Sequence, residues 1–122
     1  MLNAVIQKMN LKIIHENFTE IIELDENSPG TCREIYNAAP FQSNAEKWKQ
    51  EIYFKIPVKL KKENQSAAVK KGDVAYFPPM KVLCIFYGTS QPVAPVNVIG
   101  KVKNPGKFSE VRSGDLMKVV RI

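Results

Sequence analysis

The sequence is poor in the residues that build metal, redox and catalytic sites. Its 122 residues include two cysteines and one histidine. Neither Cys32 nor Cys84 has the CxxC or CxxH spacing of metal and redox motifs. His15 has no cysteine or serine pattern that would recruit it, so we expect an ordinary surface histidine. The sequence therefore predicts neither a bound metal nor a cofactor.

Long hydrophobic runs are missing as well. No segment approaches the ~20 apolar residues that span a bilayer. Residues 1–10 lack the basic start, the apolar stretch and the cleavage pattern of a secretory signal. We therefore expect no membrane partner and a cytoplasmic location. In a reducing compartment both cysteines are expected to remain free thiols, with Cys84 packed as a small apolar residue.

Arginine is scarce although the chain is basic, with a net charge of +6. Fifteen of the eighteen basic residues are lysines, and residues 47–81 carry nine basic against three acidic groups. A positive surface attracts nucleic acid, but base recognition favours the planar arginine fork. We interpret the lysine clusters at 59–62 and 70–71 as the solvated tip of a hairpin. Nucleic acid is thus not the expected partner, and nonspecific binding through this tip is kept as an alternative.

Length and composition fit a single domain. A chain of 122 residues can bury one continuous core without disulfides or a metal. The content of 44% hydrophobic and 25% charged residues is typical of globular proteins. We assign residues 10–122 to the domain and residues 1–9 to an N-terminal extension. The apolar residues of the extension are spaced as on one helical face, although an additional strand would also fit.

Short β-type segments dominate the chain. Residues 11–14 and 18–24 predict a hairpin with a tight polar turn. Apolar and polar residues alternate over 51–56, which indicates a strand with one buried face. Residues 82–87 are almost continuously apolar, so we expect burial on both faces, by the core inside and a helix outside. Further strands are expected at 74–77, 96–102 and 116–122. A mainly β fold with about eight such strands predicts a closed eight-stranded β-barrel.

One α-helix has clear boundaries in the sequence. Ser28 can cap the first free amides, and Pro29 suits the first helical position. Apolar residues then recur at helical spacing as far as Ala39, and Pro40 ends the helix. We expect its apolar face to close one mouth of the barrel. A short helical turn is expected at 108–112.

Four segments carry a family resemblance: Trp48 with EIYF and Pro57, then GDVAYFPP at 72–79, LCIFYG at 83–88 and PVNVIGKV at 95–102. Together they resemble the small cyclophilin-like proteins of prokaryotes. The resemblance covers most of residues 10–122 and implies an eight-stranded cyclophilin-type barrel. Two departures are visible. Met80 stands where the family usually has glycine, and the loop between Gly88 and Pro95 is short.

The resemblance also bears on catalysis. Cyclophilins isomerise X-Pro bonds, whose uncatalysed barrier is ~18–20 kcal/mol. They use an apolar pocket and an arginine on a barrel strand. The arginines here are Arg33, Arg112 and Arg121, all outside residues 41–102, and a lysine is a poor substitute. We therefore expect no efficient prolyl isomerase, and a divergent isomerase is kept as an alternative.

The leading hypothesis is a barrel that binds a peptide or a small ligand in a surface groove. Glu51 adjoins an apolar strand, where burial perturbs the pKa of a carboxyl group, and aromatic residues nearby suggest a mixed pocket. Asp73 is interpreted as a turn residue after Gly72. Any single aromatic residue would also serve core packing, whereas the cluster as a whole predicts a groove. The candidate ligand-binding residues are Trp48, Glu51, Tyr53, Tyr76, Pro78, Pro79 and Phe86.

Overall fold

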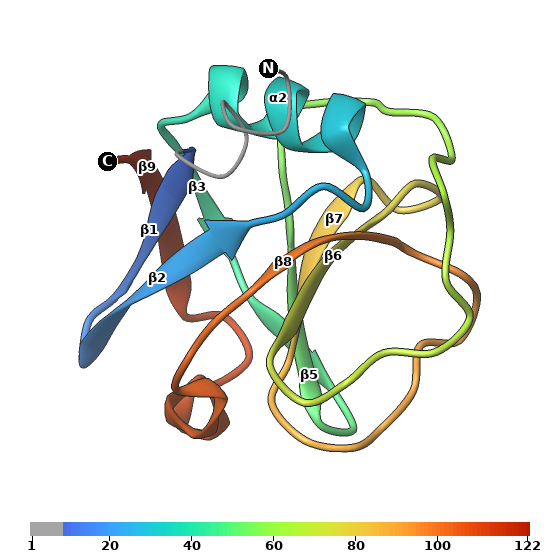
Figure 1. Ribbon diagram of the computed structural model, residues 1–122. Coiled ribbons are helices and arrows are strands. Elements are labelled where there is room, and N and C mark those ends of the chain that lie inside the picture. The colour runs from blue at the N-terminus through green and yellow to red at the C-terminus, as the bar shows by residue number, and fades with distance from the viewer. Residues whose placement is uncertain (1–8) are drawn as a thin grey trace.

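The computed structural model describes residues 9–122, so the expected helix or strand of the N-terminal extension lies outside the described residues. The described chain forms one antiparallel sheet that curls into a nearly closed barrel (Figure 1). Its strands are β1 (Asn10–His15), β2 (Phe18–Leu24), β3 (Phe41–Asn44), β4 (Glu46–Trp48), β5 (Glu51–Lys55), β6 (Asp73–Phe77), β7 (Val82–Phe86), β8 (Asn97–Lys101) and β9 (Leu116–Arg121). An α-helix, α2 (Pro29–Ala38), and a 3-10 helix, η1 (Pro105–Glu110), complete the described elements.

The barrel is brought together by one bent segment. The strand order is β3-β9-β1-β2-β8-β6-β7-β5-β4, and β3 and β4, at its two ends, follow each other in the chain. They are separated by Ala45, whose N–H donates to the Asp115 carbonyl and whose carbonyl accepts from the Gly114 N–H, both at 2.7 Å. When this bent segment is counted once, the described strands number eight, in agreement with the predicted eight-stranded barrel.

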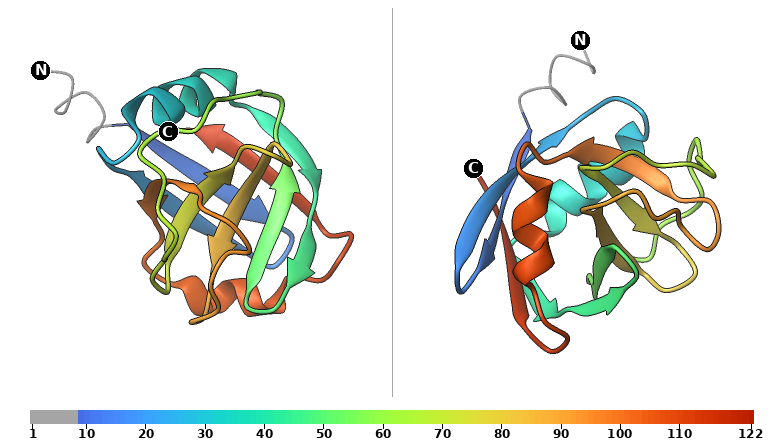
Figure 2. Two further views of the ribbon diagram at one scale, coloured as in Figure 1. Left: turned by 90° about the vertical axis from the view of Figure 1, so that its right-hand side faces the viewer. Right: turned by 90° about the horizontal axis from the view of Figure 1, so that it is seen from below.

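Helix α2 lies across one end of the barrel, as expected (Figures 1 and 2). Cys32 and Ile35 are fully buried and belong to the main core. At the C-terminal end of the helix, the Arg121 guanidinium donates to the carbonyls of Tyr36 and Asn37 at 3.1 and 3.2 Å. The short helical turn is present too, but it covers Pro105–Glu110 and not residues 108–112.

The N-terminal cap of α2 comes from a distant loop and not from Ser28. The Ser28 hydroxyl makes no cap and instead donates to the Glu63 carbonyl. The Glu63 carboxylate accepts from the N–H groups of Gly30 (3.0 Å) and Thr31 (2.7 Å), and from the Thr31 hydroxyl (2.7 Å). Burial alone would raise the pKa of Glu63, but these hydrogen bonds outweigh it and lower that pKa.

The lysine-rich segment around Glu63 is therefore not a solvated hairpin tip, and that interpretation was wrong. Strands β5 and β6 are separated by β7 in the sheet, so they cannot form a hairpin. Residues 56–72 are a crossover loop between them. Asn97, on β8, helps to fasten this loop because its side chain accepts from the Glu63 N–H and donates to the Lys61 carbonyl.

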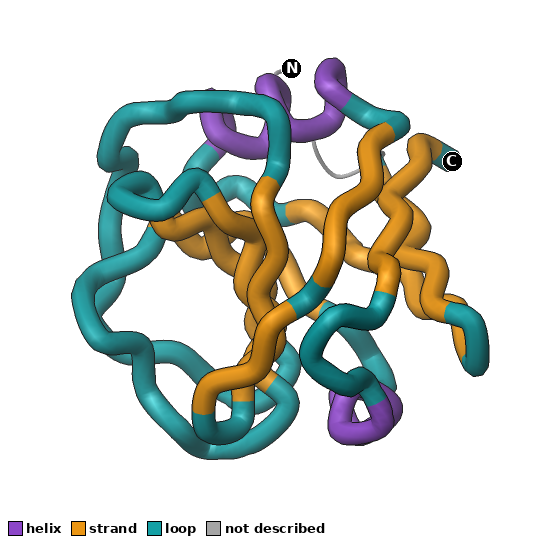
Figure 3. The backbone as a smooth tube through the Cα atoms, turned by 180° about the vertical axis from the view of Figure 1, so that it is seen from behind, coloured by secondary structure: helices purple, strands orange, loops and turns teal. Residues whose placement is uncertain are grey.

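The apolar residues form two clusters, one on each side of part of the sheet. The main cluster fills the barrel and includes Leu83 and Ile85 of β7. The second cluster includes Val82, Cys84 and Phe86 from the same strand. β7 is thus buried on both faces, as predicted, but loops 56–72 and 87–96 take the place of the expected outer helix (Figure 2, left; Figure 3).

Three smaller expectations, on the first hairpin, on Asp73 and on the two cysteines, are also confirmed. Strands β1 and β2 form a hairpin in which His15 pairs with Phe18. Asp73 is a turn residue, since its carboxylate accepts from the Lys70 N–H and its own N–H donates to the Lys70 carbonyl. Cys32 and Cys84 are both free and buried. Within residues 9–122, no helix has the length and apolar character needed to cross a membrane.

Replacing Gly100 by alanine should strongly destabilise the barrel. Gly100 pairs with Leu24 of β2, and an added Cβ would lie 2.2 Å from the Glu23 carbonyl oxygen. Backbone cannot yield as a flexible side chain does, so we expect a loss of about 2–4 kcal/mol in the free energy of unfolding. Urea denaturation measures it. Gly106→Ala is the control, because its Cβ would meet no atom within 4 Å. Equal stability of the two variants would contradict the packing described.

Glu63→Ala should lower the free energy of unfolding by about 1–2 kcal/mol, because it removes the remote cap of α2. The exposed Glu34→Ala, on the same helix, is the matched control. Since the folded pKa of Glu63 is lowered, its contribution is fully present above the usual value of 4.5 and is lost as pH falls through the folded value. A difference between the two variants that persists unchanged at pH 2 would argue against the cap.

Candidate functional site

A pocket of about 230 Å³ lies on the outer face of β5, β7 and β6. Its mouth carries Trp48, Met80 and Val93, which are 37%, 44% and 76% exposed. These are three of the five large hydrophobic residues described as exposed. Exposed apolar side chains thus gather at this opening, which is unusual for a surface that meets only water. The lining residues are Trp48, Glu51, Tyr53, Phe77, Met80, Val82, Cys84, Pro92, Val93 and Val96.

The floor of the pocket follows from the register of the sheet. In a strand, alternate residues point to the same face, and residues paired across antiparallel strands share that face. Strands β4, β5, β7 and β6 therefore present a continuous row of side chains outward. The facing pairs that line the pocket are Trp48 with Glu51, Tyr53 with Cys84, and Phe77 with Val82.

The outer wall is supplied by loop 87–96, which side-chain amides hold in place. The backbone N–H of Gln50 donates to the Ser90 hydroxyl at 3.0 Å, and the side-chain oxygen of Gln50 accepts from the Thr89 N–H at 2.8 Å. The Gln91 side chain bonds both the N–H and the carbonyl of Val69, at 2.8 and 3.1 Å. These hydrogen bonds fix the loop to the β4–β5 turn and to loop 56–72, so the wall of the pocket is preformed.

Glu51 is the electrostatic feature of the pocket. Its side chain lines the pocket, yet the residue is only 7% exposed. Burial raises the pKa of this carboxyl group, and a hydrogen bond with the Cys84 thiol offsets the rise only in part. Burial, together with the neighbouring Glu51, raises the pKa of Cys84 well above its usual value. Because the thiolate is the nucleophilic form of cysteine, the raised pKa of Cys84 disfavours a nucleophilic role, and its burial favours a packing role.

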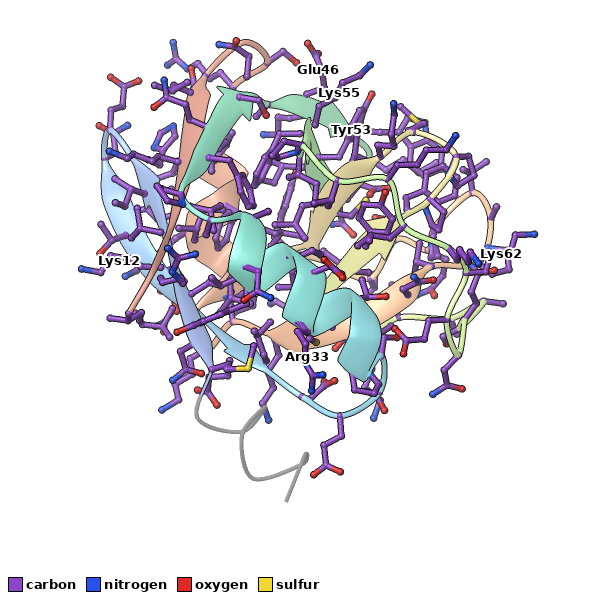
Figure 4. The ribbon with its side chains drawn as sticks, turned by 90° about the horizontal axis from the view of Figure 1, so that it is seen from above. Lys12, Arg33, Glu46, Tyr53, Lys55 and Lys62 are labelled. Carbon is purple, nitrogen blue, oxygen red and sulfur yellow. The ribbon has the colours of Figure 1, made fainter. Side chains whose placement is uncertain are left out.

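The structure brings together three of the seven candidate residues. Trp48, Glu51 and Tyr53 all line the pocket. Figure 4 shows Tyr53 near Glu46 and Lys55 on the β4–β5 rim, well away from Arg33 on α2.

The other four candidates do not line this pocket. Tyr76 points into the barrel core, where its hydroxyl donates to the Val58 carbonyl and accepts from the Leu60 N–H. Phe86 is on the outer face but is fully buried beneath the loops. Pro78 and Pro79 form the β6–β7 turn and do not line the pocket.

Seven of the lining residues are not among the seven candidates drawn from the sequence. Three of them, Phe77, Val82 and Cys84, lie on strands β6 and β7. The alternation of side chains along these strands, together with the pairing of Cys84 with Tyr53, could have indicated that they share the outer face. Met80 was noted only as a departure from the family pattern. The remaining three come from the 87–96 loop and its junction with β8, and no periodic signal places a loop residue over a sheet. They are Pro92, Val93 and Val96.

A second polar group, made by His15, Glu16 and Asp115, lies beside the β1–β2 turn. His15 is buried, not on the surface as expected, and its Nε2 donates to Asp115 Oδ2 at 2.7 Å. The Asn17 N–H donates to its Nδ1 at 3.2 Å, so both ring nitrogens are engaged. Glu16 lies close enough to complete a three-ligand group. With both nitrogens occupied, His15 acts as a link between two turns and has no free ring nitrogen to offer a metal.

Comparison with known proteins establishes the family. Residues 9–120 match the family model described as Cyclophilin-like, so the chain belongs to the cyclophilin-like family. It is similar to the solution structure of a hypothetical protein from Archaeoglobus fulgidus, with 36% sequence identity and a TM-score of 0.83. That match covers 95% of this chain and 96% of the archaeal one. The comparison with curated proteins found no match. The family resemblance in the sequence is thus confirmed.

Glu51→Gln should raise stability at neutral pH. Because the folded pKa of Glu51 is raised, wild-type stability is greatest below the usual value of 4.5 and declines as pH rises through the folded value. The neutral amide avoids this decline. Relief of about 1 kcal/mol would raise Tm by roughly 4 °C in a chain of this size. Thermal unfolding from pH 4 to pH 8 measures the difference, which should vanish at pH 4. A lower Tm for the variant at pH 7 would show that Glu51 stabilises the fold.

Proposed function

We propose that this protein is a cyclophilin-like binding module that takes the apolar part of a peptide or small ligand into the pocket on β5, β7 and β6, without efficient prolyl isomerisation. The observation that carries the proposal is the gathering of Trp48, Met80 and Val93 around one preformed apolar pocket. Exposed apolar residues cluster where a partner covers them. Covering them on binding would release ordered water and supply most of the affinity.

The size of the pocket limits what it can take. Its 230 Å³ lie below the range of about 300–1,000 Å³ that holds drug-sized ligands. A water molecule occupies about 30 Å³ in the liquid, so the pocket corresponds to roughly eight waters. A single side chain of a peptide, or a compound of roughly ten non-hydrogen atoms, matches that volume.

The positions of the arginines support binding without efficient isomerisation. No arginine is among the residues that line the pocket. Arg121 is engaged with the carbonyl groups at the end of α2, and Arg33 lies on the exposed side of that helix. The lining of the pocket therefore lacks a guanidinium that could weaken the amide resonance of a bound X-Pro bond.

Two further expectations stay with this proposal. Glu63 ties the lysine-rich segment to α2, which supports a structural role for that segment rather than a mobile arm for nucleic acid. Both cysteines are free, which supports the cytoplasmic location expected from the sequence.

A small neutral aromatic compound tests the proposal. 2-Phenylethanol should bind with a dissociation constant of about 0.1–10 mM, as is usual for fragments of this size. Trp48 is the single tryptophan and lies at the pocket mouth, so its fluorescence reports binding directly. Amide NMR shifts should map to the lining residues. The double variant Met80→Ala, Val93→Ala should weaken binding about fivefold, since it removes apolar contact area at the mouth.

Leu116→Ala is the matched control, because Leu116 is 49% exposed and lies away from the pocket. It should leave the dissociation constant unchanged. Shifts scattered over the surface, or equal effects of the mouth and control variants, would refute the pocket as the binding site. Cleavage-coupled isomerisation of a proline peptide that is abolished by Tyr53→Ala would refute the absence of catalysis.

A further inference from the structure

The pocket carries charge of only one sign. Of its ten lining residues, Glu51 alone bears a formal charge, and no lysine or arginine is among them. The chain as a whole has eighteen basic and twelve acidic residues. The lining of this pocket thus contains one carboxyl group and no lysine, although the protein as a whole is basic.

The hydrogen bonding of Glu51 is incomplete. A carboxylate can accept about four hydrogen bonds. Glu51, at 7% exposure, has the Cys84 thiol as its recorded partner, and a thiol is a weak donor. No other described residue bonds its side chain, so the remaining acceptor positions face the pocket. Among the described residues no fully buried side-chain oxygen lacks a hydrogen-bond partner, so the unpaired Glu51 oxygens keep contact with solvent in the pocket, where a ligand can reach them.

The aromatic residues of the lining also favour a positively charged ligand. Trp48, Tyr53 and Phe77 line the same pocket as Glu51, and the face of an aromatic ring attracts cations. The Lys49 ammonium already lies 4.6 Å from the centroid of the Trp48 ring. Lys49 is not a lining residue, so the pocket itself is left without a cation.

We propose that the occupant of this pocket is an organic ammonium ion on a short apolar body, with the ammonium received by Glu51 and the body held by Trp48, Tyr53 and Phe77. The inference rests on the proposed function and specifies its ligand class. The ammonium supplies the donors that the carboxylate lacks. A free amine and a lysine side chain of a peptide share this chemistry.

Other ligand charges fit the lining less well. An anion would lie against the Glu51 carboxylate in a desolvated site, where repulsion between like charges is strong. A neutral apolar group would displace water from Glu51 and return no hydrogen bond. A cation removes both penalties, and the aromatic residues of the lining can attract it further.

Three compounds with one aromatic body separate these cases: 2-phenylethylammonium, 2-phenylethanol and phenylacetate. Binding to the full chain at pH 7 is followed by Trp48 fluorescence and by NMR shifts of the lining residues. We expect the ammonium to bind about tenfold more tightly than the alcohol, as one charge-assisted hydrogen bond would give. Phenylacetate should bind more weakly than either.

Glu51→Gln should weaken ammonium binding about tenfold and should leave alcohol binding within about twofold. Glu46→Gln is the matched control, because it makes the same change of net charge at an exposed residue beside the pocket that is not part of its lining. It should alter neither affinity. An acetylated, amidated peptide with one internal lysine distinguishes the source of the ammonium: tighter binding than that of the free amine indicates a peptide, and weaker binding indicates a small amine.

Equal affinity for the ammonium and the alcohol, unchanged by Glu51→Gln, would overturn this inference and leave the proposed function in place. Tightest binding of phenylacetate would overturn it as well. Failure of all three compounds to bind would overturn the proposed function together with the inference. The comparison on the wild-type chain keeps the test valid whatever the stability of the Glu51 variant.

Discussion

The structure depends on a strand that is buried on both sides. Every residue of β7 is buried, with Leu83 and Ile85 facing the barrel interior and Val82, Cys84 and Phe86 facing outward. Leaving a large apolar side chain in water costs about 1.5–3 kcal/mol. The outer face of the sheet must therefore be covered, although α2 is already used to close one end of the barrel (Figure 1). Two long loops supply the cover.

Loops can take this role only if they are anchored, and the strongest anchors are polar. Glu63 fastens the first loop to α2, and Gln91 fastens the second loop to Val69 of the first. The cover ends between Met80 and Val93, and the pocket lies there. Proteins break their own packing rules chiefly at functional sites. A buried carboxyl group that gains little from its surroundings is such an exception, which is why we connect Glu51 with a ligand.

The sequence predicts the parts of this fold that local chemistry determines. Alternation over 51–56 identifies the inner face of β5, and Pro29 and Pro40 bound α2 because proline restricts the backbone directly. Contacts between distant residues leave no such signal. The Glu63 cap spans 32 residues of sequence, and the His15–Asp115 pair spans 100. Tyr76 was misplaced for a related reason: β6 is apolar on both faces, so its pattern does not say which side is the core.

The central claim is that Glu51 is a desolvated carboxyl group open to a ligand. A carbon-13 NMR titration of the glutamate side-chain carboxyl resonances, with Glu51 assigned through Glu51→Gln, tests it most directly. We predict that the pKa of Glu51 lies above the usual value of 4.5 and falls when 2-phenylethylammonium is present at saturation. A Glu51 resonance that titrates at the usual value and does not respond to the amine would contradict the account.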